Sequence, residues 1–226
     1  MAPSAPEGGM KARLPAIYRD EHGQVPTEIV IDDRELRLMV RGVEFSGLDF
    51  DMLEPKPGSD PTRCGEFTLQ SGSLVSCEIE STMPILVAVG DATQECSLHL
   101  RIEVPRAEPK VWNWAKAFLT LTMGDKTFSS AGHSGHFESE MLDIQRQLPD
   151  GTYLKACINC AYSDYSPAGQ DMTGMMCFRR HKAAYLSVVG KRDMFRVTAE
   201  AKPEYVQEFH LCPEFERRRP GSGYRG

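Results

Sequence analysis

The stretch CSLHLRIEV, residues 96–104, alternates apolar and polar side chains along its whole length. Side chains two positions apart in an extended strand point to the same face of a sheet. The alternation therefore predicts a β-strand with one face in a core and the other in solvent. The predicted core face consists of Cys96, Leu98, Leu100, Ile102 and Val104.

The two-residue period recurs on both sides of this stretch, and short turn sequences separate the alternating segments. The pattern lacks long helices between strands, which disfavours a parallel doubly wound sheet. We therefore expect a mainly β protein of the α+β type, with an antiparallel, sandwich-like core from about Thr27 to Phe128. The expected neighbouring strands cover residues 28–31, 36–45, 67–69, 74–79, 85–89, 117–123 and 126–128.

Composition divides the chain of 226 residues into three regions. Residues 1–24 are rich in Pro, Gly and charge, and we expect a disordered tail there, with at most a short ordered patch from Leu14 to Tyr18. Residues 25–150 hold the β core and one amphipathic helix at about 136–148, capped by Ser134. Residues 151–226 form a cysteine-rich module with a basic tail, and a shorter helix is expected over residues 180–188.

Charge is distributed unevenly over the chain, whose formal net charge is −6. Residues 151–226 carry 12 Lys and Arg against 8 Asp and Glu, whereas the rest of the chain carries 14 against 24. Affinity for nucleic acid depends on neutralising phosphates, so this balance disfavours nucleic acid as a partner. Arg217, Arg218 and Arg219 precede a Pro-Gly-Ser-Gly run, and we expect them to lie in a solvated tail.

Targeting signals and the cysteine count bear on location. The longest apolar run has five residues, 85–89, far below the roughly 20 needed to cross a bilayer. The first residues have neither a basic start nor an apolar stretch, so no secretory signal is expected. We expect a cytoplasmic protein without a membrane partner. In that reducing compartment, an odd count of seven cysteines disfavours a disulfide framework.

Three of the seven cysteines are expected to be packing or incidental thiols. Cys77 and Cys96 alternate with apolar residues in predicted strands, and Cys64 stands alone in a Pro- and Gly-rich stretch. Free cysteine is among the most buried residue types. These three thiols are therefore not assigned to a site.

The other four cysteines give the strongest chemical signal: Cys157 and Cys160 form a CxxC pair, and Cys177 and Cys212 follow as single residues. A CxxC pair binds one metal ion from a tight turn, and two more thiolates complete a tetrahedral site. Zinc leads, because structural zinc sites favour four thiolates. A [4Fe-4S] cluster is the rival, because a proline follows Cys212 as it follows one ferredoxin ligand.

Two further alternatives stay open for these cysteines. They could be packing thiols or a redox pair, although the turn sequence after Cys160 does not resemble the helix start that activates thioredoxin-like thiols. His181 or His210 could also replace one thiolate as a ligand. A site built on His133 and His136 is disfavoured, because no carboxylate partner lies near them in the sequence.

The C-terminal part of the chain resembles an uncharacterised bacterial family, a domain of unknown function. The resemblance rests on CINCAYSDYSP at 157–167, MCFR at 176–179, LCPEFE at 211–216 and GYRG at 223–226. It covers roughly the last 90 residues and, more weakly, the β-rich part. The family has no known activity, but the resemblance implies that the four cysteines and the tail belong to one module.

These observations favour a non-catalytic, metal-stabilised binding or interaction protein with a protein as candidate partner. Its rival is an iron–sulfur or cysteine-based redox protein. A third class is a nucleic-acid-binding zinc module that would use Arg179, Arg180, Lys182 and the arginine tail, and salt-dependent binding would identify it. An enzyme is disfavoured, and no catalytic residue is assigned.

Overall fold

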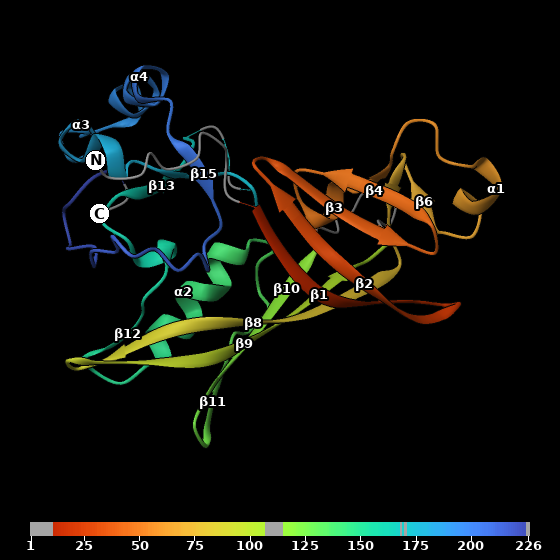
Figure 1. Ribbon diagram of the computed structural model, residues 1–226, viewed down its shortest axis with the longest axis horizontal. Coiled ribbons are helices and arrows are strands. Elements are labelled where there is room, and N and C mark those ends of the chain that lie inside the picture. The colour runs from red at the N-terminus through yellow and green to blue at the C-terminus, as the bar shows by residue number, and fades with distance from the viewer. Residues whose placement is uncertain (1–10, 107–114, 168, 170, 225–226) are drawn as a thin grey trace, which may run out of the picture.

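The computed structural model of the chain describes residues 11–106, 115–167, 169 and 171–224. Ten strands form one sheet in the order β11-β10-β9-β8-β1-β2-β3-β4-β5, with β12 also paired to β8 (Figure 1). Each neighbouring pair is antiparallel, so the prediction of a mainly antiparallel β protein is confirmed. The strands are β1 (Lys11–Asp20), β2 (Gly23–Asp32), β3 (Glu35–Val40), β4 (Val43–Gly47), β5 (Glu54–Pro55), β8 (Cys77–Val89), β9 (Ala92–Val104), β10 (Lys116–Met123), β11 (Lys126–Ser129) and β12 (Thr152–Leu154).

The longest hairpin joins β8 and β9, which pair from Cys77 opposite Val104 to Val89 opposite Ala92. In β9 the predicted core face is buried, and the side chains between its members are exposed or half-buried. The strand prediction over residues 96–104 is confirmed. β9 begins four residues earlier than its alternation, at Ala92, because the hairpin extends beyond the core.

β1 corrects the prediction of a disordered tail over residues 1–24. It lies between β8 and β2 in the sheet, and residues 1–10 lie outside the described residues. Leu14, Ala16 and Tyr18 are buried at alternate positions, and the polar side chains between them gave the segment its polar composition. Pro15 has no N–H for the sheet, but the Ser81 hydroxyl donates to its carbonyl oxygen at 2.8 Å. In this segment, the two-residue alternation of buried side chains therefore predicts the structure better than the polar composition does.

α2 (Phe137–Gln147) confirms the predicted amphipathic helix. Phe137, Met141 and Ile144 are buried, and the helix packs against β10. Its N-cap residue is His136 rather than Ser134, whose hydroxyl instead hydrogen-bonds the Glu140 carboxylate at 2.9 Å. The helix thus starts one residue later than predicted.

The C-terminal region surrounds a small three-stranded sheet at one side of the molecule (Figure 1). The predicted helix over 180–188 is split into a short 3₁₀ segment and a helix that ends at Leu186. A further helix was not predicted, because only Met194 and Val197 are buried in it. These elements are η2 (Cys157–Asn159), β13 (Ser163–Tyr165), β14 (Met175–Cys177), η3 (Arg179–His181), α3 (Lys182–Leu186), α4 (Lys191–Ala201) and β15 (Glu204–Val206).

The remaining short elements lie between β4 and β8. They are η1 (Phe50–Met52), α1 (Pro61–Cys64), β6 (Leu69–Gln70) and β7 (Ser73–Leu74). Among the described helices, none combines the length and apolar character that crossing a membrane requires.

Two clusters of buried side chains organise the chain. The large cluster takes residues from β2–β4, β8–β10, α2 and part of the C-terminal region. The small cluster lies within the C-terminal region and contains Phe178 and Tyr185, whose rings stack with centroids 4.8 Å apart. β14 contributes to both, because Met175 and Cys177 belong to the large cluster and Met176 to the small one.

Candidate functional site

The four cysteines predicted to act together all lie in the C-terminal region. Cys157 begins η2, and Cys160 follows its last residue. The Cys160 N–H donates to the Cys157 carbonyl oxygen at 3.0 Å and closes the tight turn. Cys177 ends β14, and Cys212 lies in the segment after β15. All four are buried free thiols.

Main-chain hydrogen bonds bring the three segments together. The Cys157 N–H donates to the carbonyl oxygen of His210 at 3.2 Å, and the Ile158 N–H donates to that of Glu208 at 2.9 Å. Ser163 pairs with Cys177 between β13 and β14. The segment that carries Cys212 is therefore fixed beside the CxxC turn, although 55 positions separate Cys157 from Cys212 in the numbering.

The thiols are close enough to affect one another electrostatically. Burial raises the pKa of Cys157 far above its usual range, and Cys160, Cys177 and Cys212 raise it further. Burial also raises the pKa of Cys177 to about 11, although the backbone N–H and the charge of Arg179 counteract the rise. As free thiols, both groups are therefore protonated at neutral pH.

The geometry does not itself form a coordination site. Within the described part of the chain, no three His, Cys, Asp or Glu side chains are placed to hold one metal ion. The structure brings the four cysteines into one neighbourhood, and their sharing of an ion stays a prediction. A zinc ion with Zn–S bonds of about 2.3 Å would require the sulfur atoms to move closer together.

The histidines considered as substitute ligands differ in environment. Burial lowers the pKa of His210 to about 4, with a smaller contribution from the Arg179 charge. This ring is therefore neutral. His181 is exposed at the end of η3. His133 and His136 are exposed beside α2, away from the cysteines in the chain. None of them is placed as part of a metal-binding group in the described residues.

The three unassigned cysteines lie outside this cluster. Cys77 and Cys96 are buried in the large core, and Cys64 is half-buried and packs against it. Burial raises the pKa of Cys77 to about 12. The burial of Cys77 and Cys96 is the one that the alternation predicts.

The arginine tail corrects the prediction of a solvated segment. The Ala161 N–H donates to the Glu216 carbonyl oxygen at 2.7 Å, and the Arg218 N–H donates to the Asn159 carbonyl oxygen at 2.9 Å. Between these bonds, Cys160 and Arg217 form an antiparallel bridge. The tail therefore pairs with the CxxC turn in the manner of an edge strand.

Side chains of the tail strengthen this attachment. The Arg218 guanidinium donates to the Tyr185 hydroxyl at 3.0 Å, to the Ser222 carbonyl oxygen at 3.1 Å and to the Ser163 carbonyl oxygen. Arg217 lies over the Tyr153 ring, 4.3 Å from its centroid. In the sequence, the run of three arginines marks this segment. From the composition around it, we expected a solvated tail rather than an attached one.

A buried acidic cluster lies where the β core, α2 and the C-terminal region meet. Asp49, Glu138, Asp171 and Glu208 line one small cavity there. Burial raises the pKa of Glu208 to about 8 and that of Asp49 to about 7. The Tyr165 hydroxyl donates to one oxygen of Glu208, and the other oxygen has no hydrogen-bond partner among the described residues. Sequence reasoning missed this cluster, because its members come from distant segments.

The fold and the site define a mainly antiparallel β protein with a buried cysteine cluster in its C-terminal region. The chain belongs to DUF6304, a family of unknown function, whose family model matches residues 12–163. The match includes Cys157 and Cys160, whereas Cys177, Cys212 and the arginine tail lie beyond it. Neither a curated protein nor a solved structure matches the chain.

Proposed function

We propose that the chain is a non-catalytic binding or interaction protein of the cytoplasm, stabilised by a zinc ion bound by Cys157, Cys160, Cys177 and Cys212. In this proposal the sheet forms a sandwich-like core, and the metal stabilises the C-terminal module packed on it. The observation that carries the proposal is the common neighbourhood of four buried thiols from three separate segments.

The chemistry of the thiols supports a metal over a redox pair. A thiol acts as a nucleophile only as the thiolate, and the raised pKa of Cys157 and Cys177 disfavours that form. Metal binding displaces the protons instead. The Arg179 backbone N–H and side chain, which interact with Cys177 and Cys212, would stabilise their thiolates once formed.

The packing of the module also supports a structural metal. Among the described residues, the small core that lies wholly within the module contains far fewer buried residues than the large core. A metal site absent from the unfolded chain contributes its binding free energy to folding. No three of these side chains are placed to hold one ion in the described geometry, so the proposal requires the sulfur atoms to move together around the ion.

Metal analysis and an absorption spectrum of freshly purified protein test the proposal. We expect one zinc ion per chain and no visible absorption. Cys212→Ser should lower the zinc content, and Cys96→Ala, which changes a buried cysteine of the β core, should leave it unchanged. Protein purified without metal, or equal zinc content in both variants, would contradict the four-thiolate site.

An iron–sulfur protein is the second candidate, because it uses the same four thiolates and Pro213 follows Cys212. Visible absorption with stoichiometric iron and sulfide would establish it in place of zinc. A nucleic-acid-binding module gains no support, because Arg179 and Arg180 pair with Glu204 at 2.7 and 3.0 Å, and Lys182 pairs with Glu216 at 3.0 Å.

A further inference from the structure

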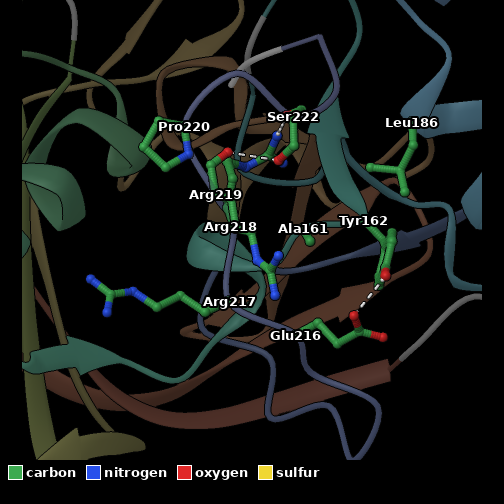
Figure 2. A pocket seen from close by; sticks show the side chains of 9 residues that line it. All are labelled: Ala161, Tyr162, Leu186, Glu216, Arg217, Arg218, Arg219, Pro220 and Ser222. Atoms are coloured by element: carbon green, nitrogen blue, oxygen red, sulfur yellow. Dashed lines mark hydrogen bonds between the residues drawn. The ribbon is translucent and has the colours of Figure 1, made fainter.

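A half-open pocket of about 810 Å³ lies between the arginine tail and the residues that follow the CxxC pair. Figure 2 shows Glu216 joined to Tyr162 by a hydrogen bond on one side, with Pro220 and Ser222 on another. Its size is within the range of small-molecule sites. The lining residues are Ala161, Tyr162, Leu186, Glu216, Arg217, Arg218, Arg219, Pro220 and Ser222.

The walls of this pocket are held in place. Main-chain hydrogen bonds of 2.7 and 2.9 Å pair residues 216–218 with residues 159–161. The Tyr162 hydroxyl donates to Glu216 at 2.7 Å, and the Lys182 ammonium lies 4.5 Å from the centroid of the Tyr162 ring. The Ser222 hydroxyl donates to the Arg219 carbonyl oxygen at 2.7 Å. A ligand would therefore meet walls that are already ordered.

The charge of the lining favours an anion. The lining contains three arginines and a single carboxylate, that of Glu216. Arg217 lies over the Tyr153 ring, and Figure 2 shows its side chain extended away from the other labelled residues. Arg218 donates to neutral oxygen atoms. The Nε of Arg218 is buried without a hydrogen-bond partner in the described chain.

Arg219 is the residue best able to bind a ligand directly. It is exposed, and its guanidinium forms no hydrogen bond within the described residues. Guanidinium groups bind phosphate and carboxylate oxygens through paired hydrogen bonds. A phosphate monoester carries about −1.5 to −2 charges at pH 7 and three strong acceptor oxygens, so it offers this guanidinium more charge and more acceptors than a single carboxylate does.

The remaining lining favours an organic body on that anion. Ala161, Leu186, Pro220 and the Tyr162 ring supply apolar surface, and Leu186 is 44% exposed although it is a large apolar residue. The pocket is also far larger than a phosphate group needs. Apolar walls with a few placed charges are the usual composition of a small-molecule site.

We propose that this pocket binds a small phosphate monoester, with Arg219 contacting the phosphate and Leu186 and Pro220 contacting an apolar body. This inference rests on the binding role proposed above and names the chemical class of the ligand. Because the pocket is built on the CxxC turn, a metal at the four cysteines would further stabilise the wall that holds the phosphate.

Calorimetric titration of the metal-loaded full chain with phenyl phosphate tests the inference. We expect saturable binding of one molecule per chain, at least tenfold tighter than that of inorganic phosphate. Arg219→Gln should weaken the binding about tenfold, as expected when a charge-assisted hydrogen bond is lost. Arg63→Gln removes an equal charge from α1, at the opposite side of the molecule (Figure 1), and should leave the affinity unchanged.

Three results would overturn the inference: no saturable binding, equal affinity for inorganic phosphate, or equal affinity in the Arg219→Gln variant. Zinc content measured on the same samples separates this outcome from failure of the metal proposal. Full zinc content without phenyl phosphate binding would refute the pocket alone. Tight binding by a chain that purifies without metal would refute the zinc proposal and leave the pocket in place.

Discussion

The β core is held by a pattern that repeats, whereas the C-terminal module is held by individual contacts that occur once each. In β9, every second side chain from Cys96 to Val104 is buried, so several equivalent residues contribute to the packing. The module has a small sheet and a small core of its own, but its tail is attached through one turn, one arginine and one short main-chain pairing. Damage to the core should therefore be graded, and damage to the module should be abrupt.

The largest expected difference between the two regions comes from removing the metal. Cys160→Ser, or chelation of the native protein, should make residues 157–215 susceptible to protease, while β8 and β9 stay protected. The reason is that zinc binding free energies of about 10 kcal/mol or more act as folding free energy at such sites. Limited proteolysis with mass spectrometry measures the cleavage positions. Equal resistance of residues 157–215 with and without metal would exclude a structural metal.

Truncating the core should have a smaller and global effect. Leu98→Ala removes a completely buried side chain from β9, and we expect unfolding free energy to fall by about 3 kcal/mol. Met39→Ala, at a side chain that is 53% exposed on β3, should change it by less than about 0.5 kcal/mol. Denaturant titration of both variants measures the difference, and similar losses would contradict the described burial.

Loss of the tail anchor should be smaller still. Arg218→Gln removes hydrogen bonds to Tyr185, Ser163 and Ser222, and we expect the module to lose about 2 kcal/mol of stability. Arg219→Gln has an equal change of charge without those bonds and serves as the control. Hydrogen exchange of the Ala161 and Arg218 amides, which pair the tail with the turn, should accelerate only in the Arg218 variant.

The last expected difference concerns the pH dependence of stability, at the acidic cluster between the two regions. Burial raises the pKa of Asp49 from 3.8 to about 7 in the folded protein, and Asp51 and Asp171 add to the rise. The folded state therefore keeps a proton that the unfolded state loses, and stability falls as pH rises from about 4 to about 7. The slope contributed by one such group is at most about 1.4 kcal/mol per pH unit.

Unfolding of Asp49→Asn measured across this pH range tests that dependence. The variant should show a flatter slope, since it lacks the titrating group, although Glu208 with a pKa of about 8 retains part of the effect. The other groups that face the cavity, His136, Glu138 and Asp171, are unchanged in the variant. An unchanged slope would show that Asp49 ionises normally.

The same contrast explains how much the sequence predicts. The strand over residues 96–104 and the helix around Met141 follow from periodic burial, which a single chain displays directly. β1 shows the same period at Leu14, Ala16 and Tyr18. The charged residues around these positions, however, make the composition of the segment resemble that of a disordered tail. Periodicity over a short window is therefore the better guide within the sheet.

The candidate site divides in the same way. The sequence already groups Cys177 and Cys212 with the CxxC pair of Cys157 and Cys160, and the structure brings the four into one neighbourhood. The pairing of the tail could not be placed from its own residues, because its main-chain partners at residues 159–161 lie more than 50 positions earlier in the numbering. Every residue has a carbonyl oxygen, and every residue except proline has a backbone N–H group. Pairing through these groups therefore cannot be predicted from a pattern of side chains.

The division of β14 between two cores limits how this part of the chain can vary in length. Successive side chains of a strand face opposite sides, so an inserted or deleted residue reverses every later position. An insertion between Met175 and Met176 would place Cys177 on the side of the small core and Met176 on the side of the large one. The cysteine would then turn away from Cys157. We therefore expect the spacing between β13 and Cys177 to accept insertions in the loop ahead of β14 but none within the strand itself.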